Sequence, residues 1–261
     1  MRDLARRIEY AELTNVAAIA AAVLGSASIE VAGGRAMYGG PGSHLNNALA
    51  LGMDGPIGPE DLDTLEEFFF TRGCAVSLAL SPQADSTLRE LLGARGYRIA
   101  QFENTLWRPI GSPPAAVRCP AEVRMAVEAE ASLVARVIFR GFADGKEPAE
   151  DELAGFLTMS STPCQWSWLA CVDGQAAGGA AMGMRQGVAM FYGDSVLPEF
   201  RGRGIQPALI ASRLADAAQR GADLAMVCTL PGTASESCYR RMGFDVLYTR
   251  PTMVRDCPSA G

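Results

Sequence analysis

The sequence has a single histidine, His44, and its seven cysteines include no Cys-x-x-Cys pair. Zinc sites need Cys and His ligands at short, regular spacings, so no metal is expected. The chain also lacks a clustered basic segment, and its formal net charge is −6. Since nucleic-acid binding requires such a segment to neutralise phosphates, no nucleic-acid partner is expected.

Long apolar runs are missing too. No segment reaches the roughly 18 consecutive apolar residues of a membrane-spanning helix, so no membrane association is expected. The Ala-rich run 16–24 follows two arginines and superficially resembles a signal peptide, but acidic residues precede it and alanine favours a helix. We therefore expect an N-terminal helix. Scattered, unpaired cysteines fit a reducing compartment and predict a cytoplasmic protein.

Residues 108–115 form a Pro/Gly/Ser cluster that predicts a linker between two halves, with domains at 1–110 and 115–256. Each half shows the same order of signals: a helix ending at Gly, a strand, a break containing Pro, a second helix, a Gly-aromatic pair and a last strand. The first copy has helices at 60–72 and 86–95, and the second has one at 207–220. Two copies of one α/β unit explain this order. The alternative is that residues that commonly end helices and strands recur by chance.

Residues 196–210 carry the main functional signal, because a strand leads through a glycine- and arginine-rich turn directly into a helix. Gly202 and Gly204 let backbone N–H groups approach a ligand, and the helix start adds unpaired donors. Arg201 and Arg203 add positive charge. The pattern predicts a site for a pyrophosphate or ribose phosphate. A basic turn that only solvates a helix start is the alternative.

The helix after this turn is predicted to bury one face and to expose the other. The buried set comprises Leu209, Ile210, Leu214, Ala217 and Ala218, and the remaining set comprises Arg213, Asp216, Gln219 and Arg220. The turn has neither the Gly-Lys-Ser/Thr ending of nucleoside-triphosphate loops nor the Gly-x-Gly-x-x-Gly of dinucleotide-binding folds, so both classes are excluded.

The strand, the Val-x-Pro and the Arg-x-x-Gly-x-Gly/Ala pattern resemble the GCN5-related N-acetyltransferases, the GNAT family. The resemblance implies an α/β (α+β) fold of two GNAT-like units, each a mixed, mainly antiparallel twisted sheet flanked by helices. It implies that acetyl-CoA is the co-substrate, with its pyrophosphate on the loop formed by Arg201, Gly202, Arg203, Gly204, Ile205 and Gln206 and its pantetheine arm on the strand at Val196. Gln206 stands where the family usually has Gly or Ala.

A second stretch, residues 233–244, resembles the family as well. Thr233 and Glu236 have capping-box spacing, and Gly243 suits a helix C-terminus. The resemblance implies that Tyr239 protonates the departing thiolate of coenzyme A as a general acid. Cys238 replaces an Asn that often precedes this tyrosine.

The base that accepts the amine proton is harder to predict. Asp194 lies two residues before Val196 on the expected cofactor strand and could collect that proton directly or through water. An ordinary strand-edge carboxylate is an equal alternative. Glu130 and Glu199 are weaker candidates, because nothing in the sequence fixes their direction.

The first half lacks a matching loop. Residues 55–59 are followed by Glu60, Asp61 and Asp63 with no arginine, and carboxylates at a helix start repel an anion. This half resembles the degenerate N-terminal halves of tandem acetyltransferases.

These patterns predict transfer of an acetyl group from acetyl-CoA to a primary amine of a small molecule or peptide by direct attack. A non-catalytic acyl-CoA sensor or interaction module is the alternative. The sequence does not specify the acceptor, the acyl chain length or the oligomeric state, a homodimer included.

Overall fold

The structure is a computed structural model that describes residues 1–111 and 117–258. The chain forms two compact units. Unit 1 comprises Met1–Asn104 with Leu247–Gly261, and unit 2 comprises Thr105–Val246. Among the described residues, no helix has the length and apolarity needed to cross a membrane. Part of the predicted linker, residues 112–116, lies outside the described residues.

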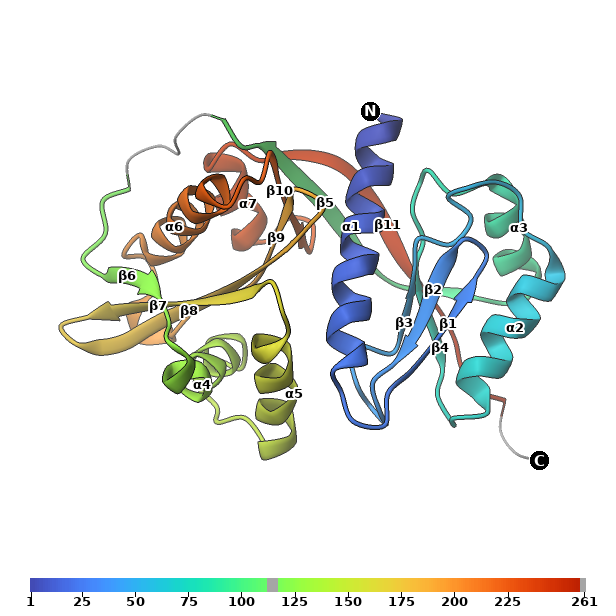
Figure 1. Ribbon diagram of the computed structural model, residues 1–261, viewed down its shortest axis with the longest axis horizontal. Coiled ribbons are helices and arrows are strands. Elements are labelled where there is room, and N and C mark those ends of the chain that lie inside the picture. The colour runs from blue at the N-terminus through green and yellow to red at the C-terminus, as the bar shows by residue number, and fades with distance from the viewer. Residues whose placement is uncertain (112–116, 259–261) are drawn as a thin grey trace. The chain divides into compact units, whose positions relative to one another are not determined.

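In unit 1, helices cover both faces of the strands (Figure 1). Its strands run in the order β1 (Ala27–Val31), β2 (Gly34–Tyr38), β3 (Asn47–Leu49), β4 (Val76–Ala79) and β11 (Asp245–Arg255). Alternate residues of β4 point to opposite faces. Leu78 joins the core under α2 (Pro59–Phe70) and α3 (Ser86–Ala94), whereas Ala79 joins the core under α1 (Arg2–Ala21). The expected N-terminal helix is thus confirmed.

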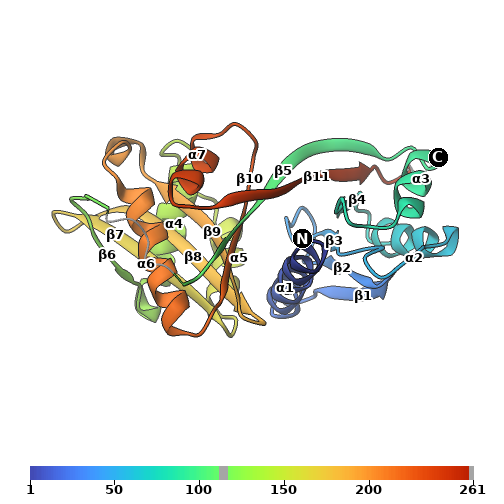
Figure 2. The ribbon, with the colours of Figure 1, turned by 90° about the horizontal axis from the view of Figure 1, so that it is seen from above.

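Unit 2 has the same layered build, and the sequence predicted the elements of its last part, from the strand before the loop onward. Its strands run β5 (Arg98–Pro109), β10 (Leu224–Thr229), β9 (Val188–Val196), β8 (Gln175–Arg185), β7 (Gln165–Val172) and β6 (Glu122–Met125). In β7, Trp168 packs with α6 (Ile205–Gln219) and Leu169 packs with α4 (Ala131–Phe142). Seen from above, α6 lies in front of these strands and α4 behind them (Figure 2). Helices α5 (Glu150–Ser161) and α7 (Ala234–Arg241) complete the two layers.

Both sheets are mixed and mainly antiparallel, as the resemblance implied. In unit 1, β3 and β4 are parallel, and in unit 2, β9 and β10 are parallel. Each parallel pair is joined by a helix, α2 in unit 1 and α6 in unit 2. The order helix, strand, helix, strand therefore recurs in the two halves as predicted. The agreement supports two copies of one α/β unit.

The last strand of each half completes the sheet of the other unit. Strand β11, the last strand of the second half, pairs antiparallel with β4, so that Thr252 to Arg255 face Ala79 to Val76. Strand β5, the last strand of the first half, lies beside β10 in unit 2. The compact units therefore differ from the predicted ranges 1–110 and 115–256, because residues 247–256 have their contacts in unit 1.

A buried ionic cluster fastens β11 to unit 1. Arg250, with a side chain only 3% exposed, donates to both carboxylate oxygens of Glu12 at 2.7 Å and contacts Glu9 at 3.3 Å. Tyr248 donates to the other oxygen of Glu9 at 2.6 Å. Burial raises the pKa of Glu9, and the charge of Arg250 opposes that rise. The guanidinium is thus the main compensation for a carboxylate that has no solvent contact.

Replacing Arg250 with methionine should lower the free energy of unfolding of unit 1 by about 3–5 kcal/mol, because a buried carboxylate loses its cation. Arg98→Met is the matched control: it breaks a pair with Asp256 whose side chains are 60% and 73% exposed. Its loss should stay below about 1 kcal/mol. Urea unfolding followed by circular dichroism measures the unfolding free energy of both variants. Equal losses in the two variants would contradict the role of Arg250 as the main compensation for the buried carboxylate.

Candidate functional site

The predicted anion loop lies between β9 and α6, after the short helix η2 (Pro198–Phe200). Gly202 and Gly204 have φ angles of +75° and +79°, which side chains with a Cβ rarely adopt. A Cβ on Gly204 would also lie 2.6 Å from the carbonyl oxygen of Arg118. The first hydrogen bond of α6 joins Ala208 N–H to the Gly204 carbonyl. The N–H groups of residues 202–206 precede it and have no acceptor among the described residues, so they remain available to an anion.

The two arginines of the loop contact protein groups. Arg201 donates to the carbonyls of Gly141 at 2.7 Å and Val196 at 3.2 Å, and it pairs with Asp144 at 3.0 Å. Arg203 donates to the Glu199 carbonyl at 3.0 Å. Arg201 therefore fastens the loop to the C-terminal end of α4. The backbone N–H groups are the donors left free for a ligand.

Gln206 departs from the family pattern, and its side chain turns toward α7 rather than outward. Its amide nitrogen lies 3.2 Å from the Ser235 hydroxyl, at the start of α7. Helix α7 itself begins as the sequence predicts, because Thr233 accepts from Glu236 N–H and Glu236 accepts from Gly232 N–H. The starts of α6 and α7 are thereby linked through one side chain.

Strand β9 leaves its parallel neighbour after four residues. Residues 188–191 pair with 224–227 of β10, whereas residues up to Val196 continue to pair with β8. The register with β8 shifts at Gly193 and Asp194, where two residues of β9 oppose one of β8, and Gly193 has φ +68°. This bulge bends β9 and re-aims its side chains. The strand edge toward β10 is open beyond Phe191.

The bulge brings the two predicted catalytic residues into contact. The Tyr239 hydroxyl donates to Asp194 Oδ2 at 2.5 Å. Both oxygens of Asp194 accept from Arg213, whose side chain has no exposed surface. Arg213 also donates to the carbonyls of Ala181 at 3.0 Å and Leu209 at 3.2 Å. Three elements, β9, α6 and α7, thus meet in one buried polar cluster.

This cluster changes how the two residues can act. Burial raises the pKa of Tyr239 well above its ordinary value, the charge of Arg213 opposes the rise, and that of Asp194 adds to it. The Asp194 side chain is 5% exposed and accepts three hydrogen bonds. If Asp194 acted as the base, its carboxylate would have to take up the amine proton in addition to the three hydrogen bonds that it already accepts.

The other candidate bases lie elsewhere in unit 2. Glu130 accepts from Arg124 at 2.7 Å through both oxygens, and these bonds lower the pKa of Glu130 to about 2. So acidic a carboxyl group is a weak base. Glu199 is exposed. Burial raises the pKa of the Cys238 thiol, which keeps it protonated and suits a small packed residue.

Arg213 is the functional candidate that the sequence analysis placed wrongly, with the exposed residues of α6. It is fully buried, whereas Ala218, expected to be buried, is exposed. A signal for this was present: Arg213 stands four residues after Leu209 and four before Ala217, on the buried stripe. A charged side chain on an apolar stripe indicates a buried partner.

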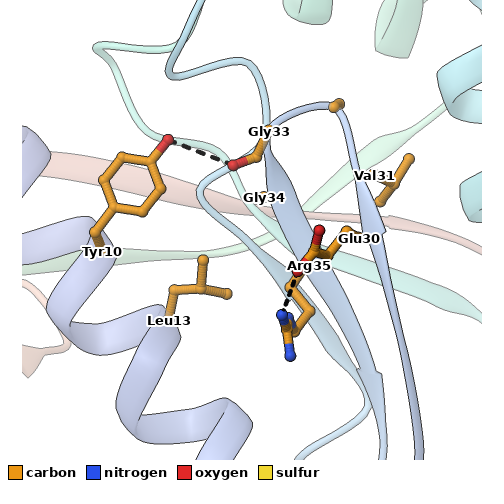
Figure 3. A pocket seen from close by; sticks show the side chains of 8 residues that line it. Tyr10, Leu13, Glu30, Val31, Gly33, Gly34 and Arg35 are labelled. Carbon is orange, nitrogen blue, oxygen red and sulfur yellow. Dashed lines mark hydrogen bonds and ion pairs between the residues drawn. The ribbon is translucent and has the colours of Figure 1, made fainter.

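Unit 1 has no equivalent of the loop among its described residues. At the start of α2, Asp61 accepts from Gly58 N–H at 2.9 Å, and Ile57 N–H donates to Thr87. Carboxylates thus occupy the place where an anion would bind. A separate cavity of about 420 Å³ lies in unit 1 between α1 and the β1–β2 hairpin, where the Tyr10 hydroxyl approaches Gly33 (Figure 3).

Comparison with known proteins agrees with this geometry. Residues 135–244 match the model of the acetyltransferase (GNAT) family. None of the curated proteins compared with the sequence matches it. Among solved structures, a GCN5-related N-acetyltransferase from Kribbella flavida has a TM-score of 0.70, with 18% identity over 98% of this chain and 96% of that one.

Two further structures are similar. A tandem GNAT protein from the clavulanic acid biosynthesis pathway has a TM-score of 0.66, with 15% identity over 92% of this chain and 86% of that one. A GCN5-related N-acetyltransferase from Sphaerobacter thermophilus has a TM-score of 0.57, with 17% identity over 70% of this chain and 60% of that one. At these identities the likeness concerns the fold. The family match covers the loop, the bulged strand and the helix of Tyr239, so residues 135–244 of this chain are similar to the acetyltransferase domains of the GNAT family.

Proposed function

We propose that unit 2 transfers an acetyl group from acetyl-CoA to a primary amine of a small molecule or peptide. The observation that carries this proposal is the loop of residues 202–206, whose N–H groups lack acceptors at the start of α6, beside a strand whose edge is open. Backbone donors and the positive end of a helix favour a pyrophosphate. An open strand edge can pair with the amides of a pantetheine arm.

The coenzyme would be held mainly by backbone groups. Residues 202–206 would donate to its pyrophosphate, and β9 near Val196 would pair with its pantetheine arm. Among the residues that the structure describes, Arg203 contacts the Glu199 carbonyl and the Phe200 ring, and its other guanidinium N–H groups could donate to phosphate. Arg201 would act by holding the loop in place.

In the reaction, a neutral amine would attack the thioester carbonyl directly, and backbone N–H groups at the splayed end of β9 would stabilise the negative charge on oxygen. Tyr239 would protonate the departing thiolate. We predict that Asp194, the residue that the sequence favours, accepts the amine proton. Because no covalent enzyme intermediate is needed, the seven cysteines have no assigned role.

A second function rests on one observation. The Tyr239 hydroxyl has no exposed surface and already donates to Asp194. A domain that binds acetyl-CoA without turning it over would tolerate this arrangement. Binding together with the absence of turnover on a broad amine panel would favour such a sensor or interaction module.

Acetyl-CoA at about 100 times its dissociation constant should add about 2.7 kcal/mol to the stability of the wild type. Gly202→Ala should abolish this gain, because the new methyl group stands among the free N–H groups of the loop. The site is otherwise open, since a Cβ there meets no atom within 4 Å. A thermal-shift titration measures the effect.

Gly221→Ala is the matched control. Gly221 follows the other end of α6, has a φ angle of +81° against +75° for Gly202, and is equally open. Both substitutions therefore carry the same backbone strain. The Gly221 variant should keep the full ligand-induced gain, and no gain in the wild type would refute binding at this loop.

Tyr239→Phe should lower the turnover number by about 10²–10⁴-fold, because it removes the proton donor for the thiolate. The Michaelis constant for acetyl-CoA should change little, since the ring still packs edge-on against Phe244 at 5.0 Å. Thiol release with the best amine from a primary-amine panel measures both constants. Unchanged turnover would show that the thiolate leaves without Tyr239.

A further inference from the structure

Arg213 is a fully buried cation in the site, and the reaction described so far gives it no role. Its guanidinium reaches groups from three directions: the Ala181 carbonyl on β8, Asp194 on β9 and the Tyr239 hydroxyl on α7, which lies 3.3 Å from Nη2. It also lies over the ring of Phe191, 4.4 Å from the centroid. Holding a charge in this environment is expensive unless every donor is used. Here the contacts use both terminal nitrogens and Nε.

The positive charge of Arg213 lies where it acts on proton transfer from Tyr239. The phenolic oxygen of Tyr239 receives a hydrogen bond from Arg213 while its own proton goes to Asp194. Once the proton has left, a phenolate remains beside the guanidinium. The charged groups that face Tyr239 are Arg213 from α6 and Asp194 from β9, and they act on that phenolate with opposite sign. Without Arg213, a buried phenolate would face only a carboxylate.

We propose that Arg213 is a positioning residue for acetyl transfer: it fixes Asp194 and Tyr239 in one geometry and places a positive charge beside the oxygen from which the proton leaves. The inference rests on the proposed function. The amine nitrogen bonds to the carbonyl carbon, the carbon–sulfur bond breaks with its electron pair on sulfur, and sulfur takes the Tyr239 proton. The surplus proton on nitrogen passes to the base of the reaction and from there to solvent, and the phenolate recovers a proton from solvent.

The bulge supports this role over simple packing. Next to the bulge, Arg213 binds the Ala181 carbonyl and the Asp194 carboxylate with the same nitrogen, each at 3.0 Å. The guanidinium therefore sits directly under the bent part of β9. If position 213 served only apolar packing, a leucine or methionine would be sufficient there.

The test uses the double variant Arg213→Met with Asp194→Asn, because removing both charges leaves no unpaired ion in the core. It should fold and keep the thermal shift with acetyl-CoA, while its turnover number falls by about 10²-fold and its Michaelis constant for acetyl-CoA changes less than about two-fold. Arg220→Met is the matched control on α6. That arginine pairs with Asp216 through an i,i+4 contact and should leave turnover unchanged.

Rescue separates this role from a structural one. Site-specific 3,5-difluorotyrosine at position 239 makes the phenol more acidic and should restore at least about 10-fold of the turnover lost in the double variant. Failure to restore turnover in a folded variant that binds acetyl-CoA overturns the role of Arg213, as does wild-type turnover in the double variant. A wild type that neither binds acetyl-CoA nor releases thiol overturns the proposed function itself.

Discussion

A buried ion pair organises the site of unit 2. Asp194 and Arg213 lie inside the sheet layer, and removing two ions from water is costly unless geometry and hydrogen bonds compensate. The compensation comes from several elements at once: β8 supplies the Ala181 carbonyl, α6 supplies the guanidinium, and α7 supplies the Tyr239 hydroxyl. None of these elements can shift by a turn or a residue without leaving a buried charge unpaired. The pair therefore fixes the bulge, both helices and the glycine-rich loop at the start of α6.

The exchange of last strands constrains the chain in a different way. Strand β11 completes the sheet of unit 1, and β5 stands beside β10 in unit 2. Neither half of the sequence can therefore form its full sheet alone. The cluster around Arg250 strengthens this dependence, since Glu9 and Glu12 come from the first helix and Arg250 from the last strand. The first half has thus kept a structural role.

The sequence predicted the elements that depend on local signals. The capping box predicted the start of helix α7. The glycines of the loop predicted a tight turn, and they adopt the positive φ angles that such a turn requires. Two features were not predicted, because they depend on non-local contacts. The exchange of β5 and β11 leaves no mark on periodicity, since each strand keeps the same pattern whichever sheet it joins. Arg213 was assigned by its charge to the solvent side, although its spacing from Leu209 and Ala217 places it on the buried stripe.

The two units differ in the donors that they present at equivalent helix starts. Helices α2 and α6 hold equivalent places, each after the first strand of a parallel pair. At α2, Asp61 accepts from the N–H of Gly58, so a donor is occupied and negative charge stands at the helix start. At α6, no carboxylate accepts from the N–H groups of residues 202–206 among the described residues. A helix start attracts anions only where its donors are free, and the same fold leaves such donors free in unit 2 but gives a self-capped helix in unit 1.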